Sequence, residues 1–142
     1  MARDVLVKGG QVRYAQTISV AHHLLQADEP VEAGGQDVGP DPYEFLLTAL
    51  GACISITLRM YADRKQWPLE DIRVRLSYGR EHVDDCAKSN GNLKWTDAIE
   101  VQLAMIGALS EDQLRRLQEI AERCPVHRTL SSPIRIRTTR VL

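Results

Sequence analysis

No internal repeat, low-complexity segment or long basic run occurs in this sequence of 142 residues. The formal net charge is -1, so the chain lacks the excess of Lys and Arg that neutralises a phosphate backbone, and nucleic acid is not an expected partner. No stretch of about 18 consecutive apolar residues is present, and the start lacks the basic-then-apolar pattern of a secretion signal. We therefore expect a cytoplasmic protein with no membrane partner.

Cysteine is scarce and odd in number, with Cys53, Cys86 and Cys124. An odd count without an export signal makes a structural disulfide framework a poor expectation, and no Cys-x-x-Cys pair occurs. Cys124 and His127 have the spacing of half a zinc site, but no second pair of suitable ligands follows, so no metal is expected. Two roles for the thiols remain, which are redox chemistry and burial as small hydrophobic side chains.

What is present indicates one globular domain over residues 1–142, because 44% of the residues are hydrophobic and 26% are charged. Composition and alternation of apolar and polar residues predict strands joined by glycine-rich or polar loops. The strands are expected at Gln11–Val20, around His23–Gln26, at Ile72–Tyr78, at Ile99–Met105 as a hairpin partner, and over Ile134–Val141 at the end; Gly34–Pro40 is expected to be a loop.

Two helices complete the prediction of an α+β fold with antiparallel sheets. Asp41, Pro42 and Glu44 have the pattern of a capping box with proline at the first helical position. The helix that follows is apolar nearly all round and should end before Pro68, so we expect it to be buried in the core or between subunits. A second capping box at Ser110 predicts a helix whose apolar side ends at Cys124.

Cys53 lies on an apolar face of the first helix, where a lone cysteine is most often an inert small hydrophobe. It becomes a nucleophile only as a thiolate, which requires a cation or a hydrogen-bond donor nearby. The cation could be the guanidinium of Arg13, Arg59 or Arg128, and the residues alone do not choose among them.

The other two cysteines have different surroundings. Cys124 is followed by an imidazole and a guanidinium, although His127 is more often a surface or interface histidine than a catalytic one. Cys86 stands beside two aspartates, whose charges raise the pKa of a thiol and slow its oxidation, so we leave it out of the site.

Two segments together resemble the OsmC/Ohr family, and its OsmC-like branch in particular. They are Gly39–Cys53 (GPDPYEFLLTALGAC) and Cys124–Leu130 (CPVHRTL). The resemblance covers nearly the whole chain and implies an OsmC-like fold in which a long central helix lies inside an intertwined homodimer. It implies a thiol peroxidase without metal, flavin or haem, in which Cys53 attacks an alkyl or lipid hydroperoxide and becomes a sulfenic acid. Cys124 then forms a disulfide with Cys53, and a dithiol such as a lipoyl group reduces that disulfide.

The resemblance also implies an arginine from an N-terminal strand that holds the thiolate, and a glutamate near the start of the central helix that positions this arginine. Arg13 and Glu44 are the nearest equivalents, although the family's glutamate stands one position earlier, at Tyr43. Glu44 is therefore either that glutamate or only the capping-box partner of Asp41.

Two other functions are compatible with the same residues. One is a non-enzymatic thiol redox sensor or small-ligand-binding stress protein of the same fold, and the other is a structural domain with buried cysteines. Turnover separates them, because an enzyme consumes many equivalents of peroxide, a sensor consumes about one per thiol, and buried thiols react with neither peroxide nor alkylating reagents until the protein unfolds.

Overall fold

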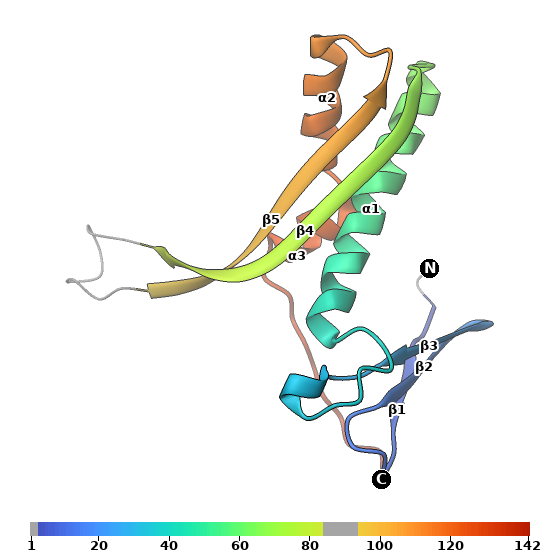
Figure 1. The fold of residues 1–142 in the computed structure, drawn as a ribbon, viewed down its shortest axis with the longest axis vertical. Coiled ribbons are helices and arrows are strands. Elements are labelled where there is room, and N and C mark those ends of the chain that lie inside the picture. Colours follow the sequence, from blue (N-terminus) through green and yellow to red (C-terminus); the bar gives the residue numbers. More distant parts are fainter. Residues whose placement is uncertain (1–2, 84–93) are drawn as a thin grey trace. The chain divides into compact units, whose positions relative to one another are not determined.

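The computed structural model describes residues 3–83 and 94–142, which form two compact units, Met1–Thr48 and Ala49–Leu142. Figure 1 shows a small antiparallel sheet in the first unit and a long hairpin with helices in the second. Helix α1 (Pro42–Lys65) begins in the first unit and continues into the second. The fold is mixed α+β with antiparallel sheets, as the sequence predicts.

The first unit is a three-stranded meander of β1 (Leu6–Gly9), β2 (Gln16–Val20) and β3 (His23–Ala27) in the order β1-β2-β3. The prediction of a strand over Gln11–Val20 is wrong in its first half. The chain reverses there between β1 and β2, with Arg13 in the left-handed region at φ 42° and the Ala15 N–H donating to the Val12 carbonyl over 3.1 Å. An antiparallel neighbour needs such a reversal, and alternation of side chains does not reveal it.

A loop organised by Asp28 follows β3 and contains the short 3-10 helix η1 (Val31–Ala33). The Asp28 side chain is only 2% exposed and accepts N–H bonds from Glu29 over 2.8 Å, Gln36 over 3.1 Å and Val38 over 3.3 Å. Burial raises the pKa of Asp28, but the three N–H donors outweigh it and hold the pKa below its usual value. Gly35 fits here because a Cβ would collide with the Glu29 carbonyl. The loop predicted over Gly34–Pro40 is confirmed.

The second unit is built on a long antiparallel hairpin of β4 (Leu69–Val83) and β5 (Lys94–Gly107). Ile72 pairs with Met105 and Tyr78 pairs with Ile99, so the predicted hairpin is confirmed. From Ile72 to Tyr78 of β4 the apolar side chains are half-buried and the intervening ones are exposed. One face of the hairpin therefore packs on the core, and α1 and α2 (Glu111–Ala121) lie along it in Figure 1.

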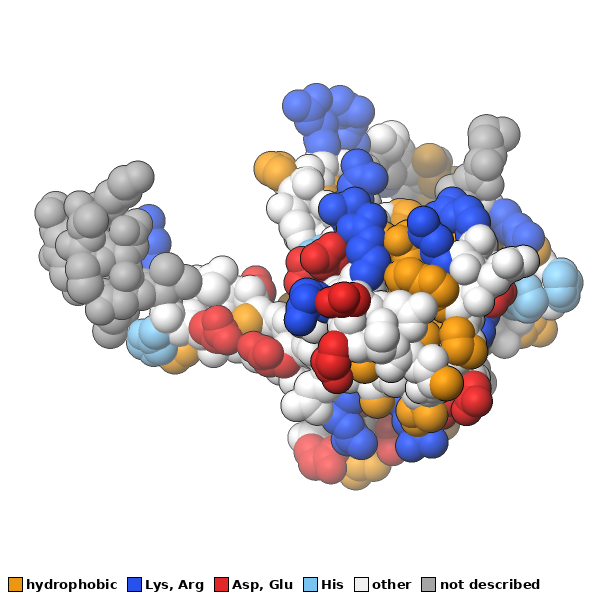
Figure 2. Space-filling model, turned by 90° about the horizontal axis from the view of Figure 1, so that it is seen from above, with side chains coloured by type: hydrophobic (Ala, Val, Ile, Leu, Met, Phe, Trp, Pro, Cys, Tyr) orange, Lys and Arg blue, Asp and Glu red, His pale blue; other side chains and the backbone are white. Residues whose placement is uncertain are grey.

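The core of the second unit joins the inner face of α1 to α2 and to the hairpin. On α1 its buried residues recur every four positions. The whole buried cluster consists of Leu50, Ile54, Leu58, Ala62, Leu69, Leu117, Ile120, Ala121 and Cys124. On another face of α1, Ile56 is 55% exposed and Met60 is 67% exposed. Hydrophobic side chains can also be seen at the surface between charged ones in the space-filling view (Figure 2). By length and composition α1 could cross a membrane, but its inner face forms this core.

Both predicted helix starts are confirmed. Asp41 and Glu44 exchange two hydrogen bonds of 2.8 Å at the start of α1, and Ser110 and Gln113 form the capping box of α2. Two other predictions are wrong. α2 ends at Ala121, before Cys124, and the described residues after Leu130 contain no strand. An alternating pattern forms a strand only when a neighbouring strand supplies its hydrogen bonds.

Candidate functional site

Cys124 occupies the N-cap position of the short helix α3 (Pro125–Leu130). Its Sγ accepts a hydrogen bond from the His127 backbone N–H over 3.3 Å, as the side-chain oxygen of serine or aspartate does at other helix starts. Pro125 at the first helical position lacks an N–H that would have no partner there. Proline therefore begins a new helix after Cys124, which is why the prediction that the preceding helix extends to Cys124 is wrong.

Cys53 meets the same turn of α3 from α1. Its Sγ accepts a hydrogen bond from the Val126 backbone N–H over 3.5 Å, one residue before the donor to Cys124. Consecutive backbone donors of α3 thus each hold one of the two sulfurs. Both cysteines are free thiols, and residues far apart in the sequence form one site.

The two thiols differ in exposure. Cys124 is 0% exposed and belongs to the core, whereas Cys53 is half-buried. Burial is the largest influence on Cys124 and raises the pKa of its thiol, against the lowering effect of the His127 N–H. The hydrogen bond and charge interaction with the Cys53 thiol raise this pKa further, and the Val126 N–H lowers it slightly. Cys124 is therefore held as a neutral thiol in the core.

Arg13 and Glu44, the other two predicted site residues, belong to the first unit. Arg13 Nη1 donates to the Gly34 carbonyl over 3.0 Å, within that unit. Glu44 Oε2 accepts from the Asp41 N–H over 2.8 Å, so its carboxylate takes part in the capping box. The structure brings Cys53 and Cys124 together in the second unit and gives Arg13 and Glu44 these local contacts in the first.

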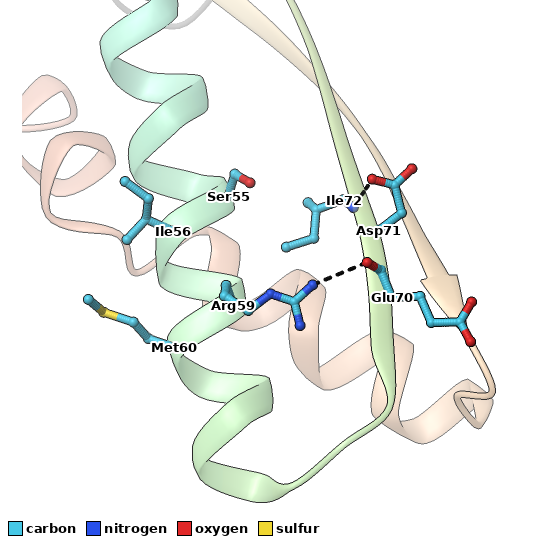
Figure 3. Close-up of a pocket in the computed structure, with 7 residues that line it drawn as sticks. All are labelled: Ser55, Ile56, Arg59, Met60, Glu70, Asp71 and Ile72. Carbon is cyan, nitrogen blue, oxygen red and sulfur yellow. Dashed lines mark hydrogen bonds between the residues drawn. The ribbon is translucent and has the colours of Figure 1, made fainter.

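Arg59, another arginine considered from the sequence, is engaged elsewhere. Its Nη1 donates to the Leu69 carbonyl over 2.6 Å, and its Nη2 donates to the Glu70 carbonyl over 3.4 Å. Figure 3 shows the guanidinium reaching from α1 toward β4. Arg59 lines a pocket of about 470 Å³ there. Ile56 and Met60 of the same lining point away from β4. Arg59 therefore joins α1 to the start of β4, while Arg128 is exposed on α3.

His127 lines two further cavities, of about 200 Å³ and about 240 Å³, between β5 and the helices. Ile99 and Val101 line both of them, so each cavity has an apolar part. The His127 Nδ1 lies 3.4 Å from the Ser131 hydroxyl oxygen. The imidazole is thus directed along α3, and the contact of His127 with Cys124 is made by its backbone N–H.

Sequence reasoning missed the backbone donors of Val126 and His127. The signal was the Cys-Pro pair, because a small polar side chain followed by proline is a common helix start. Cys86 lies outside the described residues. Within residues 3–83 and 94–142, no group of three or more His, Cys, Asp or Glu side chains is placed to hold a metal ion.

Several solved structures share this fold. An OsmC-like protein from Mycoplasma pneumoniae aligns with a TM-score of 0.72 and 19% identity, over 92% of this chain and 88% of its own. An organic hydroperoxide resistance protein OsmC from Legionella pneumophila aligns at 0.65 and 17% identity, over 92% and 89%. An organic hydroperoxide resistance protein from Elizabethkingia anophelis aligns at 0.65 and 14% identity, over 91% and 87%. At these identities the likeness establishes a shared fold.

A search of curated proteins finds none that matches this chain. The family model described as OsmC-like protein matches residues 34–139, which include both cysteines of the site, the hairpin and helices α1, α2 and α3. On this match, the chain belongs to the family of OsmC-like proteins.

Proposed function

We propose that this protein is a cysteine-based peroxidase that reduces alkyl or lipid hydroperoxides, with Cys53 as the nucleophile and Cys124 as the resolving thiol. The observation that carries the proposal is the meeting of two free thiols at the start of α3, each held by its own backbone N–H. Proteins of the same fold described as organic hydroperoxide resistance proteins support the choice of substrate.

The proposed reaction uses the two sulfurs in sequence. The Cys53 thiolate attacks one oxygen of the O–O bond, which leaves Cys53 as a sulfenic acid and releases an alkoxide that takes a proton to become the alcohol. The Cys124 sulfur then attacks the sulfenic sulfur, and the hydroxyl group leaves with the thiol proton as water. A dithiol such as a lipoyl group exchanges with the resulting disulfide, restores both thiols and becomes a cyclic disulfide itself.

The division of roles follows from exposure. A hydroperoxide from solvent reaches the half-buried Cys53 more easily than Cys124, which is 0% exposed. Burial also keeps the Cys124 thiol protonated, because its pKa is raised. A neutral buried thiol is a poor first nucleophile, since the thiolate is the reactive form. It is nevertheless in place to attack once Cys53 is oxidised.

We also propose that the protein acts as a homodimer in which Arg13 holds the Cys53 thiolate and Glu44 positions Arg13. The exposed Ile56 and Met60 on α1 support a second copy, because they offer apolar surface that an isolated chain leaves in water. The capping box does not exclude Glu44 from this role, since an ionised carboxylate has about four acceptor positions and the Asp41 N–H uses one. One domain over residues 1–142 remains our prediction.

Consumption of cumene hydroperoxide with excess dihydrolipoamide tests the peroxidase. We expect many turnovers for the natural protein and for the matched control Cys86→Ser, none for Cys53→Ser, and an interrupted cycle for Cys124→Ser. Consumption of about one equivalent per thiol, with no turnover, would instead support a redox sensor. Thiols that remain fully titratable after peroxide would rule out both functions.

A further inference from the structure

We infer that the external thiol that reduces the Cys53–Cys124 disulfide attacks the sulfur of Cys53, so that peroxide and reductant meet the protein at the same atom. This inference rests on the proposed function, which provides the disulfide, but it concerns a separate step. In a disulfide the two sulfurs are chemically equivalent until their surroundings distinguish them, and here the surroundings differ.

Access is the first difference. A thiolate attacks a disulfide along the S–S axis, from the side opposite the leaving sulfur, and the rate depends on which sulfur it can reach. To attack Cys124 it would have to approach through the core that contains Leu117 and Ala121, where Cys124 is 0% exposed. Cys53, in contrast, is half-buried and therefore partly accessible from solvent.

The fate of the leaving sulfur is the second difference. Attack on Cys53 forms a mixed disulfide between Cys53 and the reductant, breaks the S–S bond, and leaves the electron pair on Cys124. In the reduced protein the His127 N–H donates to Cys124 Sγ over 3.3 Å, and this hydrogen bond opposes the rise in pKa that burial gives the leaving thiol. Attack on Cys124 would instead require the reductant to enter the core, where Cys124 is buried.

A dithiol completes the reduction of the protein disulfide. Its second thiolate attacks the reductant sulfur of the mixed disulfide and releases Cys53 as a thiolate, and the two protons that the dithiol gives up go to the Cys124 and Cys53 thiolates. The dithiol is oxidised by two electrons and the protein disulfide is reduced by two. A monothiol stops after the first exchange, which makes the attacked sulfur visible.

The test uses the Cys86→Ser protein, so that only the two site thiols are present. Diamide forms the disulfide without peroxide, glutathione is then added briefly, and the mixture is quenched in acid and digested with trypsin. The two cysteines fall on separate peptides, Tyr14–Arg59 and Cys124–Arg128. We expect glutathione on the Cys53 peptide in roughly tenfold or greater excess. Glutathione mainly on Cys124, equal labelling of both, or failure of diamide to form the disulfide would overturn the inference.

The reverse exchange provides a second measurement, because it passes through the same sulfur. Two variants that keep only Cys53 or only Cys124 are each shown to unfold cooperatively and are then treated with an aromatic disulfide reagent, folded and in urea. We expect fast reaction of folded Cys53, slow reaction of folded Cys124, and similar rates in urea. A folded Cys124 that reacts as fast as Cys53 would contradict the inference. Since no peroxide is used, loss of peroxidase turnover and loss of this selectivity are independent results.

Discussion

Raising the pH above about 9 should destabilise the reduced protein through Cys124, whose ordinary thiol pKa is 9.0. Burial, the largest influence, raises this pKa in the folded state, so the folded chain keeps the proton after the unfolded chain has lost it. A group with a raised folded pKa contributes stability that is complete below the unfolded pKa. That contribution is lost as the pH rises through the folded pKa.

The magnitude follows from one proton. Between the unfolded and folded pKa values of Cys124, the free energy of unfolding should fall by up to about 1.4 kcal/mol for each pH unit. Tyr61 acts in the opposite direction, because its hydrogen bond with Arg116 lowers the phenol pKa and stability is gained as the phenol ionises. The effect of Cys124 must therefore be measured as a difference between two proteins that both contain Tyr61.

The assay is urea unfolding under reducing conditions at a series of pH values from about 7 to about 11, with Cys124→Ala as the matched protein. The variant should be less stable at pH 7, since it leaves a small cavity, but its free energy of unfolding should fall less steeply above about pH 9. Equal slopes for the two proteins would refute the reasoning, because they would show that Cys124 titrates alike in both states.

Three further predictions concern packing, capping and substrate. Leu117→Ala should lower the free energy of unfolding by about 2–5 kcal/mol, because Leu117 is 0% exposed. The control Arg115→Ala should lower it by less than about 1 kcal/mol. Urea unfolding of both variants checks this, and equal losses of stability would contradict it. Ser110→Ala should cost about 1 kcal/mol in the same assay, because the Ser110 hydroxyl oxygen accepts from the Gln113 N–H, and a neutral result would show that the cap adds nothing. The purified protein should reduce cumene hydroperoxide faster than hydrogen peroxide, because apolar side chains surround Cys53; faster turnover of hydrogen peroxide would remove this preference.

Local features of the fold were predictable from the sequence because their causes lie within a few residues. The capping boxes at Asp41 and Ser110 and the hairpin alternation each appear where predicted. The predictions were wrong where a segment's structure depends on a partner that is distant in the sequence. The terminal run from Ile134 has the alternation of a strand but no strand structure, and the expected strand from Gln11 is a turn in its first half. A strand is stabilised by hydrogen bonds to a neighbouring strand, and the alternation of side chains does not show whether such a neighbour exists.

For the candidate site too, some features were predictable from the sequence and others depend on the tertiary structure. The sequence by itself predicted which two residues form the site, because the segments that contain Cys53 and Cys124 resemble the OsmC/Ohr family. Only the tertiary structure decided that α3 holds both sulfurs and that one of them is buried while the other is half-buried. Spacing along a chain determines which face of a helix a residue occupies, whereas access to solvent depends on everything that packs around it.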